Sequence, residues 1–195
     1  MIIADNLQFA TVVSVHDGDS IRVAVDSQDE KGNPTKTVFG LRLGNIDAPE
    51  VFAPGYSTDQ PFGREAGNYL RSLIKGKKVA IQKTFKRDTW DRRISDVLIE
   101  NPDFSEFGLD VAGLLVDNGW AWAGLGSGNS EDLKALRYRQ AEAKAKKVGL
   151  WVGTNPIRPS VWRRLTAKRG VSKWPTDLSR DEVLTLKEFE AKYDN

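Results

Sequence analysis

The chain has 195 residues, of which 39% are hydrophobic and 29% charged, and its formal net charge is +2. This size and composition are typical of one folded domain with a terminal extension and exclude an intrinsically disordered protein. The sequence has no cysteine and no apolar run near the roughly 20 residues that cross a bilayer, which excludes disulfides, Cys-bound zinc and a transmembrane helix.

Five short apolar stretches have the alternation or the β-branched composition of strands. They occupy residues 9–15, 21–25, 37–46, 79–81 and 94–99. The turn signal Asp17-Gly18 joins the first two stretches and predicts a hairpin, and the polar connection 26–35 leads to the third. Pro49 ends the third strand, and residues 51–61 predict a loop.

Three helices are predicted from 3.6-residue apolar periodicity, capping residues and terminal glycines. They cover about residues 62–75, 109–118 and 129–148. Five short strands with helices inserted late predict an α+β, mainly β-barrel fold. We expect an OB-fold-like five-stranded barrel with three helices, because closure of a barrel removes exposed strand edges. Periodicity alone is also compatible with other α+β arrangements.

The regular pattern is lost from Trp151 onward, where prolines interrupt a basic stretch. An acidic segment from Ser179 to about Tyr193 predicts a short final helix. We therefore divide the chain into a barrel domain, residues 1–152, and a C-terminal extension, residues 153–195. The extension is expected to pack against the barrel, and an interaction segment is the alternative.

Basic and acidic residues are segregated along the chain although the net charge is small. Residues 63–93 carry 10 basic and 3 acidic residues, whereas residues 94–133 carry 8 acidic residues and no basic one. Such blocks are compatible with an acidic pocket in basic surroundings, which suits a polyanionic substrate. Solvated faces of helices and strands are the alternative interpretation.

Three charged segments lie at predicted turns. They are Asp17-Gly18-Asp19-Ser20, the stretch from Arg42 to Glu50 that contains Ile46-Asp47-Ala48-Pro49, and the stretch from Asp88 to Arg93. Each of the first two has a structural explanation when taken alone, because Asp and Gly are ordinary turn residues and Glu after Pro often begins a loop or helix. Their order and spacing together are more informative than any single segment.

Together these segments resemble the staphylococcal nuclease family. The resemblance rests on Asp17-Gly18-Asp19-Ser20, on Arg42 with Ile46-Asp47-Ala48-Pro49-Glu50, and on Asp88 with Arg92, and it covers about residues 9–152. It implies a five-stranded OB-like barrel with three helices and a bound Ca²⁺ ion, with Mg²⁺ as the alternative ion. It also implies sugar-non-specific hydrolysis of DNA and RNA to products with 3′-phosphate ends.

The resemblance implies that Asp19, Asp47 and the backbone carbonyl of Ala48 bind the metal ion. Ca²⁺ takes about 6–8 oxygen ligands, so this set leaves room for waters and a phosphate oxygen. Asp17 has two interpretations: it either supports the metal site from behind or shapes the turn. We leave Asp17 out of the ligand set.

The resemblance further implies that Glu50 acts on the attacking water, while Arg42 and Arg92 bind the phosphate. A carboxylate within hydrogen-bond reach can orient or deprotonate a water, and a planar guanidinium pairs with two phosphate oxygens at once. The alternative function is a catalytically weak or inactive nucleic-acid-binding module of the same barrel type.

The sequence departs from the family pattern at two places near the expected substrate. The stretch 123–129 offers no counterpart of a tyrosine pair that flanks the base, and Thr89-Trp90 replaces a Lys-Tyr pair near the phosphate. We expect DNA and RNA as partners, no membrane association and a monomer. Residues 1–5 show no signal-peptide pattern, so the localisation stays unassigned; the resemblance is compatible with a secreted or periplasmic protein whose signal was removed.

Overall fold

The computed structural model describes residues 6–51, 58–84, 86–101, 106–124, 130–153, 155–166 and 181–193. Its strands are β1 (Leu7–Val15), β2 (Ser20–Gln28), β3 (Pro34–Leu43), β4 (Ile46–Asp47), β5 (Lys78–Gln82), β6 (Arg93–Ser95), β7 (Val97–Asn101), β8 (Glu106–Asp110), β9 (Trp122–Ala123) and β10 (Glu182–Thr185). Its helices are α1 (Gly63–Ile74), α2 (Val111–Asp117), α3 (Glu131–Ala145), the 3-10 helix η2 (Gly149–Val152), α4 (Pro159–Thr166) and α5 (Leu186–Tyr193). No helix in these ranges is long and apolar enough to cross a membrane.

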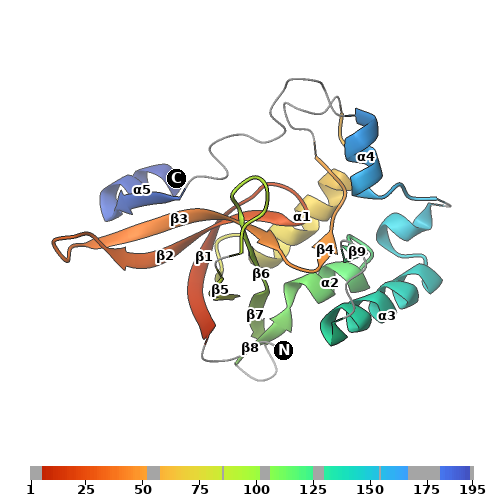
Figure 1. The fold of residues 1–195 in the computed structure, drawn as a ribbon, viewed down its shortest axis with the longest axis horizontal. Helices are drawn as coiled ribbons and strands as arrows, with labels where there is room; N and C mark the ends of the chain where they lie inside the picture. The colour runs from red at the N-terminus through yellow and green to blue at the C-terminus, as the bar shows by residue number, and fades with distance from the viewer. Residues whose placement is uncertain are drawn as a thin grey trace.

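Within the described residues, the main sheet has eight strands and curls back on itself. Its order is β10-β3-β2-β1-β5-β7-β8, with antiparallel pairing between these neighbours. β6 precedes β7 with only Asp96 between them, and β6 pairs with β3 in parallel. The bent β6–β7 segment thus connects β3 to β5 and closes the curl. Figure 1 shows this sheet with α2, α3 and α4 lying together on its right-hand side.

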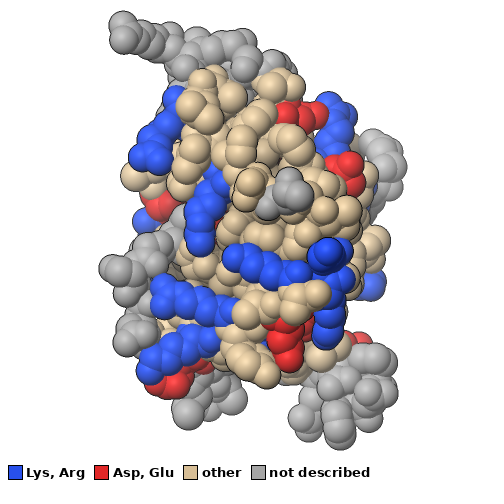
Figure 2. Space-filling view, turned by 90° about the vertical axis from the view of Figure 1, so that its right-hand side faces the viewer, with Lys and Arg blue, Asp and Glu red and all other residues tan. Residues whose placement is uncertain are grey.

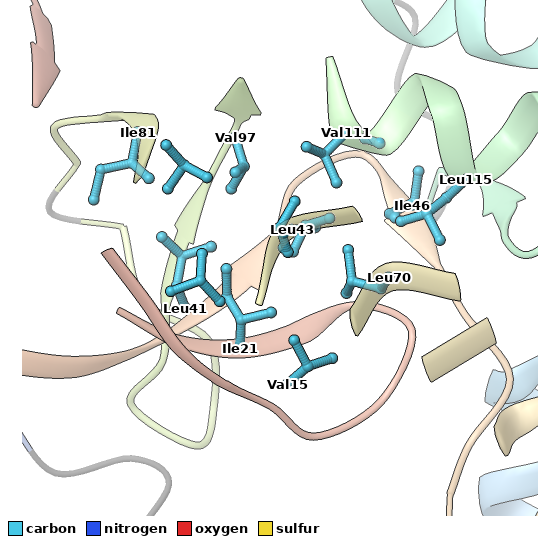
Figure 3. Close-up of a cluster of buried hydrophobic side chains, with 14 of the residues drawn as sticks. Val15, Ile21, Leu41, Leu43, Ile46, Leu70, Ile81, Val97, Val111 and Leu115 are labelled. Carbon is cyan, nitrogen blue, oxygen red and sulfur yellow. The ribbon is translucent and has the colours of Figure 1, made fainter. Parts of the chain in front are cut away.

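One hydrophobic core fills the inside of the curled sheet. Alternate residues of the strands point inward and meet apolar side chains of α1 and α2 (Figure 3). Its most deeply buried members include Val12, Val23, Phe39, Leu41, Leu43, Ile46, Leu70, Ile74 and Leu115. Full burial of one such side chain contributes about 1.5–3 kcal/mol, so this core stabilises the platform that carries the turns.

The α+β, barrel-type fold predicted from the sequence is confirmed, but two predicted elements differ in detail. The predicted strand 94–99 divides at Asp96 into β6 and β7, which pair with different strands. The second helix begins at Val111, because the Asp110 side chain accepts hydrogen bonds from the backbone N–H groups of Ala112 and Gly113. Strand β8, which was not predicted, ends at that capping residue.

Within the described residues, the extension adds β10 and α5 to the barrel, and the segment before α4 is linked to Gln60, just before α1. β10 adds to the edge of β3, and Phe189 of α5 packs against Ala24 and Val38. The predicted helix from Ser179 is therefore wrong in its first part, since residues 182–185 form a strand that covers an open sheet edge. Helix α4 was not predicted.

Several sequence predictions fall partly outside the described residues. They concern the chain start at residues 1–5, part of the loop 51–61, most of the stretch 123–129, and the beginning of the predicted final helix at 179–180.

Candidate active site

The turn between β1 and β2 carries the first pair of acidic residues. The backbone N–H of Asp19 donates to Oδ1 of Asp17 at 3.0 Å, so Asp17 shapes the turn. Gly18 is required by close packing, because a Cβ there would lie 2.7 Å from the Cβ of Ala48 and 2.9 Å from that of Ala66. The turn therefore sits directly against the second acidic segment and α1.

The second acidic segment follows β3 and is held by short strands. β4 pairs with β9, which places Asp47 opposite Trp122. The backbone N–H of Leu43 donates to the Asp19 carbonyl at 2.9 Å, and the backbone N–H of Ala48 donates to the Asp19 carboxylate at 2.9 Å. Hydrogen bonds from two backbone N–H groups to Asp19 thus fix the distance between the two turns.

Arg42 connects the carboxylates of the two turns. Its Nη2 donates to Oδ2 of Asp19 at 3.2 Å and to Oδ1 of Asp47 at 2.9 Å. Its Nη1 donates to the carbonyls of Leu43 and Ile46 at 3.1 and 3.0 Å. One buried guanidinium therefore lies between Asp19 and Asp47 and is held there by the backbone.

Glu50 is held by the start of α1. Its backbone N–H donates to the side-chain oxygen of Gln60 at 3.1 Å, and its carbonyl accepts from the backbone N–H of Gln60 at 2.8 Å. A Cβ at Gly63 would lie 2.3 Å from the Glu50 carbonyl oxygen, so only glycine allows α1 to start this close. The Glu50 side chain is buried, with a relative exposure of 7% for the residue.

Arg92 reaches the site from the turn before β6. The Asp88 carboxylate accepts the backbone N–H groups of Trp90 and Arg92 at 2.9 and 3.0 Å, and it accepts Nε of Arg92 at 2.7 Å. Nη1 of Arg92 donates to the hydroxyl of Ser20, which in turn donates to Asp19 at 3.0 Å. Arg92 is thereby linked to the first turn.

Helix α4 brings a further arginine to the acidic residues. Nη1 of Arg163 donates to Oδ1 of Asp47 at 3.2 Å and to Oε1 of Glu50, and Nη2 donates to Oδ2 of Asp47 at 3.4 Å. The sequence analysis did not select Arg163. Its position after Trp162 in a basic stretch was visible, but no local pattern relates it to residues more than 110 positions earlier.

These side chains meet at a pocket of about 210 Å³. The residues that line it include Asp19, Arg42, Glu50, Trp90, Arg92 and Arg163. Asp47 lies behind this wall, where it binds both Arg42 and Arg163. The structure therefore brings together all five charged side chains singled out in the sequence. Trp90 was noted only as a departure from the family pattern, and the structure places its ring at the pocket, 5.4 Å from Cζ of Arg92.

Burial and neighbouring charges divide the carboxylates into two groups. Burial, and then the charges of Asp17 and Asp19, raise the pKa of Glu50 to about 8. Burial, and then Asp19, also raise the pKa of Asp47. Burial acts in the same direction on Asp19, but Arg42 and Arg92 outweigh it and lower the pKa of that carboxyl. The site therefore combines an ionised Asp19 with a Glu50 that holds its proton near neutral pH.

The carboxylates at this site are the kind of ligand that a hard divalent cation prefers, but they are not arranged around one ion position. No three His, Cys, Asp or Glu side chains within the described ranges already enclose one ion-sized position. Instead, guanidinium groups lie between the carboxylates, with Arg42 between Asp19 and Asp47 and Arg163 between Asp47 and Glu50. The candidate metal ligands are all oxygen atoms, as Ca²⁺ and Mg²⁺ prefer. In this structure arginine side chains supply the positive charge that neutralises them.

Comparison with known proteins gives one family and several relatives. The family model described as staphylococcal nuclease homologue matches residues 40–153, a range that includes four of the five selected residues and begins after Asp19. An uncharacterized endonuclease of Escherichia coli O157:H7 is 34% identical over 152 residues, which are 78% of this chain and 82% of that protein. Protein ParB of Escherichia coli is 31% identical over 160 residues (81% and 80%). Endonuclease Htp3 of Saprolegnia parasitica is 32% identical over 148 residues (72% and 68%).

Proposed function

Because this chain belongs to the staphylococcal nuclease family, we propose that it is a metal-dependent, sugar-non-specific nuclease that hydrolyses phosphodiester bonds of DNA and RNA. The proposed ion is Ca²⁺, and the proposed products carry 3′-phosphate ends. The observation that carries the proposal is the meeting of three carboxylates and two arginines, from separate turns, at one buried site: Asp19, Asp47, Glu50, Arg42 and Arg92. The endonuclease names of relatives from Escherichia coli and Saprolegnia parasitica support the same reaction class.

The proposed metal ligands are Asp19, Asp47 and the backbone carbonyl of Ala48. Asp19 and Asp47 support this assignment because their carboxylates lie close enough to share one donor of a cationic group, Nη2 of Arg42. The hydrogen bond from Ala48 to Asp19 keeps that backbone beside the carboxylates. A bound Ca²⁺, or Mg²⁺ as the alternative, would neutralise phosphate charge and act as a Lewis acid.

Glu50 is the proposed general base. Its carboxylate lies at the wall of the pocket, where an attacking water would meet a bound phosphate. A carboxylate that is buried and surrounded by other acidic groups is a stronger base than an exposed one, and the raised pKa of Glu50 follows from those causes. In its ionised form, Glu50 would orient the water and accept its proton.

Arg42 and Arg92 are the proposed phosphate-binding groups. Arg42 is fixed by two backbone carbonyls, and Arg92 is fixed by Asp88. Cations that are already oriented stabilise the charge that develops on the phosphate in the transition state without first having to reorganise. A planar guanidinium can also donate in parallel to two phosphate oxygens, for which Nη2 of Arg42 would exchange its contacts with Asp19 and Asp47 for the phosphate.

The function is tested by digestion of plasmid DNA and of RNA with Ca²⁺, with Mg²⁺ and with a chelator. The wild-type chain is compared with Glu50→Gln, and the matched control is Glu65→Gln, an exposed residue of α1. We expect cleavage with Ca²⁺, none with chelator, and loss of most activity only in Glu50→Gln. End-labelling of the products should find 5′-hydroxyl groups that are open to phosphorylation.

Binding of nucleic acid without cleavage in either metal ion would contradict the proposal. That result would instead favour a nucleic-acid-binding module of the same barrel type. Cleavage that survives both chelation and Glu50→Gln would contradict the metal site and the base, even if the protein remained a nuclease.

A further inference from the structure

Helix α4 places one positive charge against Asp47, one of the proposed metal ligands. Arg163 touches both oxygens of Asp47 and also binds Glu50, and its side chain is 20% exposed. Asp47 is one of the proposed metal ligands and Glu50 is the proposed base. A single side chain from the extension therefore occupies two of the groups on which catalysis depends.

The segment that leads into α4 is tied to the same site by a buried glutamine. The side-chain nitrogen of Gln60 donates to the carbonyl of Ile157 at 2.6 Å, while its side-chain oxygen accepts the backbone N–H of Glu50. Gln60 is only 3% exposed. Pro159, the first residue of α4, is also buried. Arg163 thus belongs to a helix that is packed against the site, and its contact is not an isolated surface ion pair.

The guanidinium of Arg163 and a divalent cation cannot both bind Asp47 at low cost, because Arg163 contacts Oδ1 and Oδ2 whereas Arg42 contacts only Oδ1. Both would bind the same carboxylate oxygens within a few ångströms of each other, and like charges repel strongly in a poorly solvated site. Arg163 also uses Oε1 of Glu50, an atom that a nucleophilic water would need. Metal binding to Asp47 and the packing of α4 through Arg163 are therefore expected to compete.

We propose that α4 is a built-in plug of the metal site, in which Arg163 contacts both carboxylate oxygens of Asp47 and must leave before a divalent ion binds Asp47. This proposal rests on the proposed function, because it requires Asp47 to be a metal ligand. Competition at one site is reciprocal: the metal ion weakens the contact of α4 as much as α4 weakens the binding of the metal ion.

The proposal is tested by calorimetric titration of the full chain with Ca²⁺ alone, without nucleic acid. The wild-type chain is compared with Arg163→Ala and Arg163→Gln, and the control is Arg164→Ala, the exposed neighbouring arginine of α4. We expect both Arg163 variants to bind Ca²⁺ about 5- to 100-fold more tightly, the usual range of coupling between competing ligands. Arg164→Ala should match the wild type.

The tryptophan emission of α4 gives a second readout that does not depend on activity. Trp162 precedes Arg163, and its indole nitrogen is buried. Saturation with Ca²⁺ should change the emission of the wild-type chain, because α4 leaves the site and Trp162 changes its surroundings. This change should largely disappear in Trp162→Phe, which lacks the reporting side chain.

Equal Ca²⁺ affinity in wild type and Arg163 variants would overturn the plug and leave the nuclease function standing. Weaker binding in both variants would also overturn it, because Arg163 would then support the metal site. If neither the wild type nor the variants bind Ca²⁺, the proposed metal site itself fails, and the plug fails with it.

Discussion

At the scale of single residues, the site depends on the shape of arginine as well as on its charge. Arg42 uses two nitrogens to reach two carboxylates and two carbonyls, and a lysine could not reproduce this fork. We predict that Arg42→Lys and Arg92→Lys each lower kcat by about 10²–10³, the usual cost of losing one oriented transition-state donor. The measurement is steady-state cleavage of a short DNA substrate.

The control for these variants is Arg64→Lys. Arg64 is largely exposed and pairs with Asp59 at the surface, so this change should leave turnover unaffected. If Arg42→Lys or Arg92→Lys kept near-native turnover, that arginine would not belong to the catalytic site.

The burial of Glu50 makes the stability of the metal-free protein depend on pH. Its pKa is about 8 in the folded chain and near 4.5 when exposed, so the folded state binds its proton more tightly. Its contribution to stability is therefore fully present below about pH 4.5 and is lost as pH rises through about 8. Glu50→Gln removes this dependence.

We predict that, in chelator, Glu50→Gln has nearly the wild-type melting temperature at pH 5 but melts at a higher temperature than the wild type at pH 9. Thermal unfolding followed by circular dichroism measures the difference. Glu65→Gln is the exposed control and should track the wild type at both pH values. A difference in melting temperature between Glu50→Gln and wild type that stays constant across this pH range would show that folding does not raise the pKa of Glu50.

Most of the site was predictable from local sequence, because its residues lie in three short segments whose order and spacing are informative. Asp19 lies in the turn before β2, Asp47 ends the short strand β4 and Glu50 lies shortly after it, and the structure brings these segments together. Arg163 was not predictable in the same way. Its contact with Asp47 depends on how a distant extension folds over the barrel, which no short-range pattern encodes.

At the scale of elements, the predictions failed where tertiary pairing overrides local propensity. Residues 182–185 form a strand only because the edge of β3 is open to them. The helix that follows carries a local signal, since Thr185 and Glu188 form a reciprocal capping box at its start. The capping box marks where α5 begins. The predicted helix therefore had the correct end, near Tyr193, but its predicted start at Ser179 was too early.

The docking of α5 through Phe189 is expected to stabilise the whole barrel. Phe189 is 9% exposed and packs against Ala24 and Val38 on the sheet. We predict that Phe189→Ala lowers the free energy of unfolding by up to about 3 kcal/mol, because it removes a buried aromatic side chain. Urea denaturation measures the change, with the exposed Glu190→Ala as control. Equal stability of the two variants would mean that α5 contributes little to the fold.

At the scale of the whole molecule, basic side chains are scattered over the side on which α3 and α4 lie. Figure 2 shows Lys and Arg distributed across this face, with smaller acidic patches between them. Part of it is hollowed, and Lys144, Lys147 and Arg158 line that hollow together with Trp151. A nucleic-acid strand that extends beyond the active site would meet this charge, since phosphate groups dominate such binding.

We predict that the affinity of Glu50→Gln for single-stranded DNA falls as salt rises, with a log–log slope of about −0.7 for each phosphate contact. Combining Lys144→Ala, Lys147→Ala and Arg158→Ala should flatten this slope. With fewer protein cations on the phosphates, binding releases fewer counterions from the DNA. Lys187→Ala, an exposed residue of α5, is the control and should leave the slope unchanged. Fluorescence anisotropy at several salt concentrations measures it, and an unchanged slope in the triple variant would place the strand elsewhere.

The most direct test of the site as a whole is a crystal structure of Glu50→Gln with Ca²⁺ and a short DNA strand. We predict one ion about 2.3–2.6 Å from oxygens of Asp19, Asp47 and the Ala48 carbonyl. A backbone phosphate should lie within hydrogen-bond distance of Arg42 and Arg92. An ion bound away from these carboxylates, or a strand whose phosphates avoid both arginines, would contradict the assignment of this pocket as the active site.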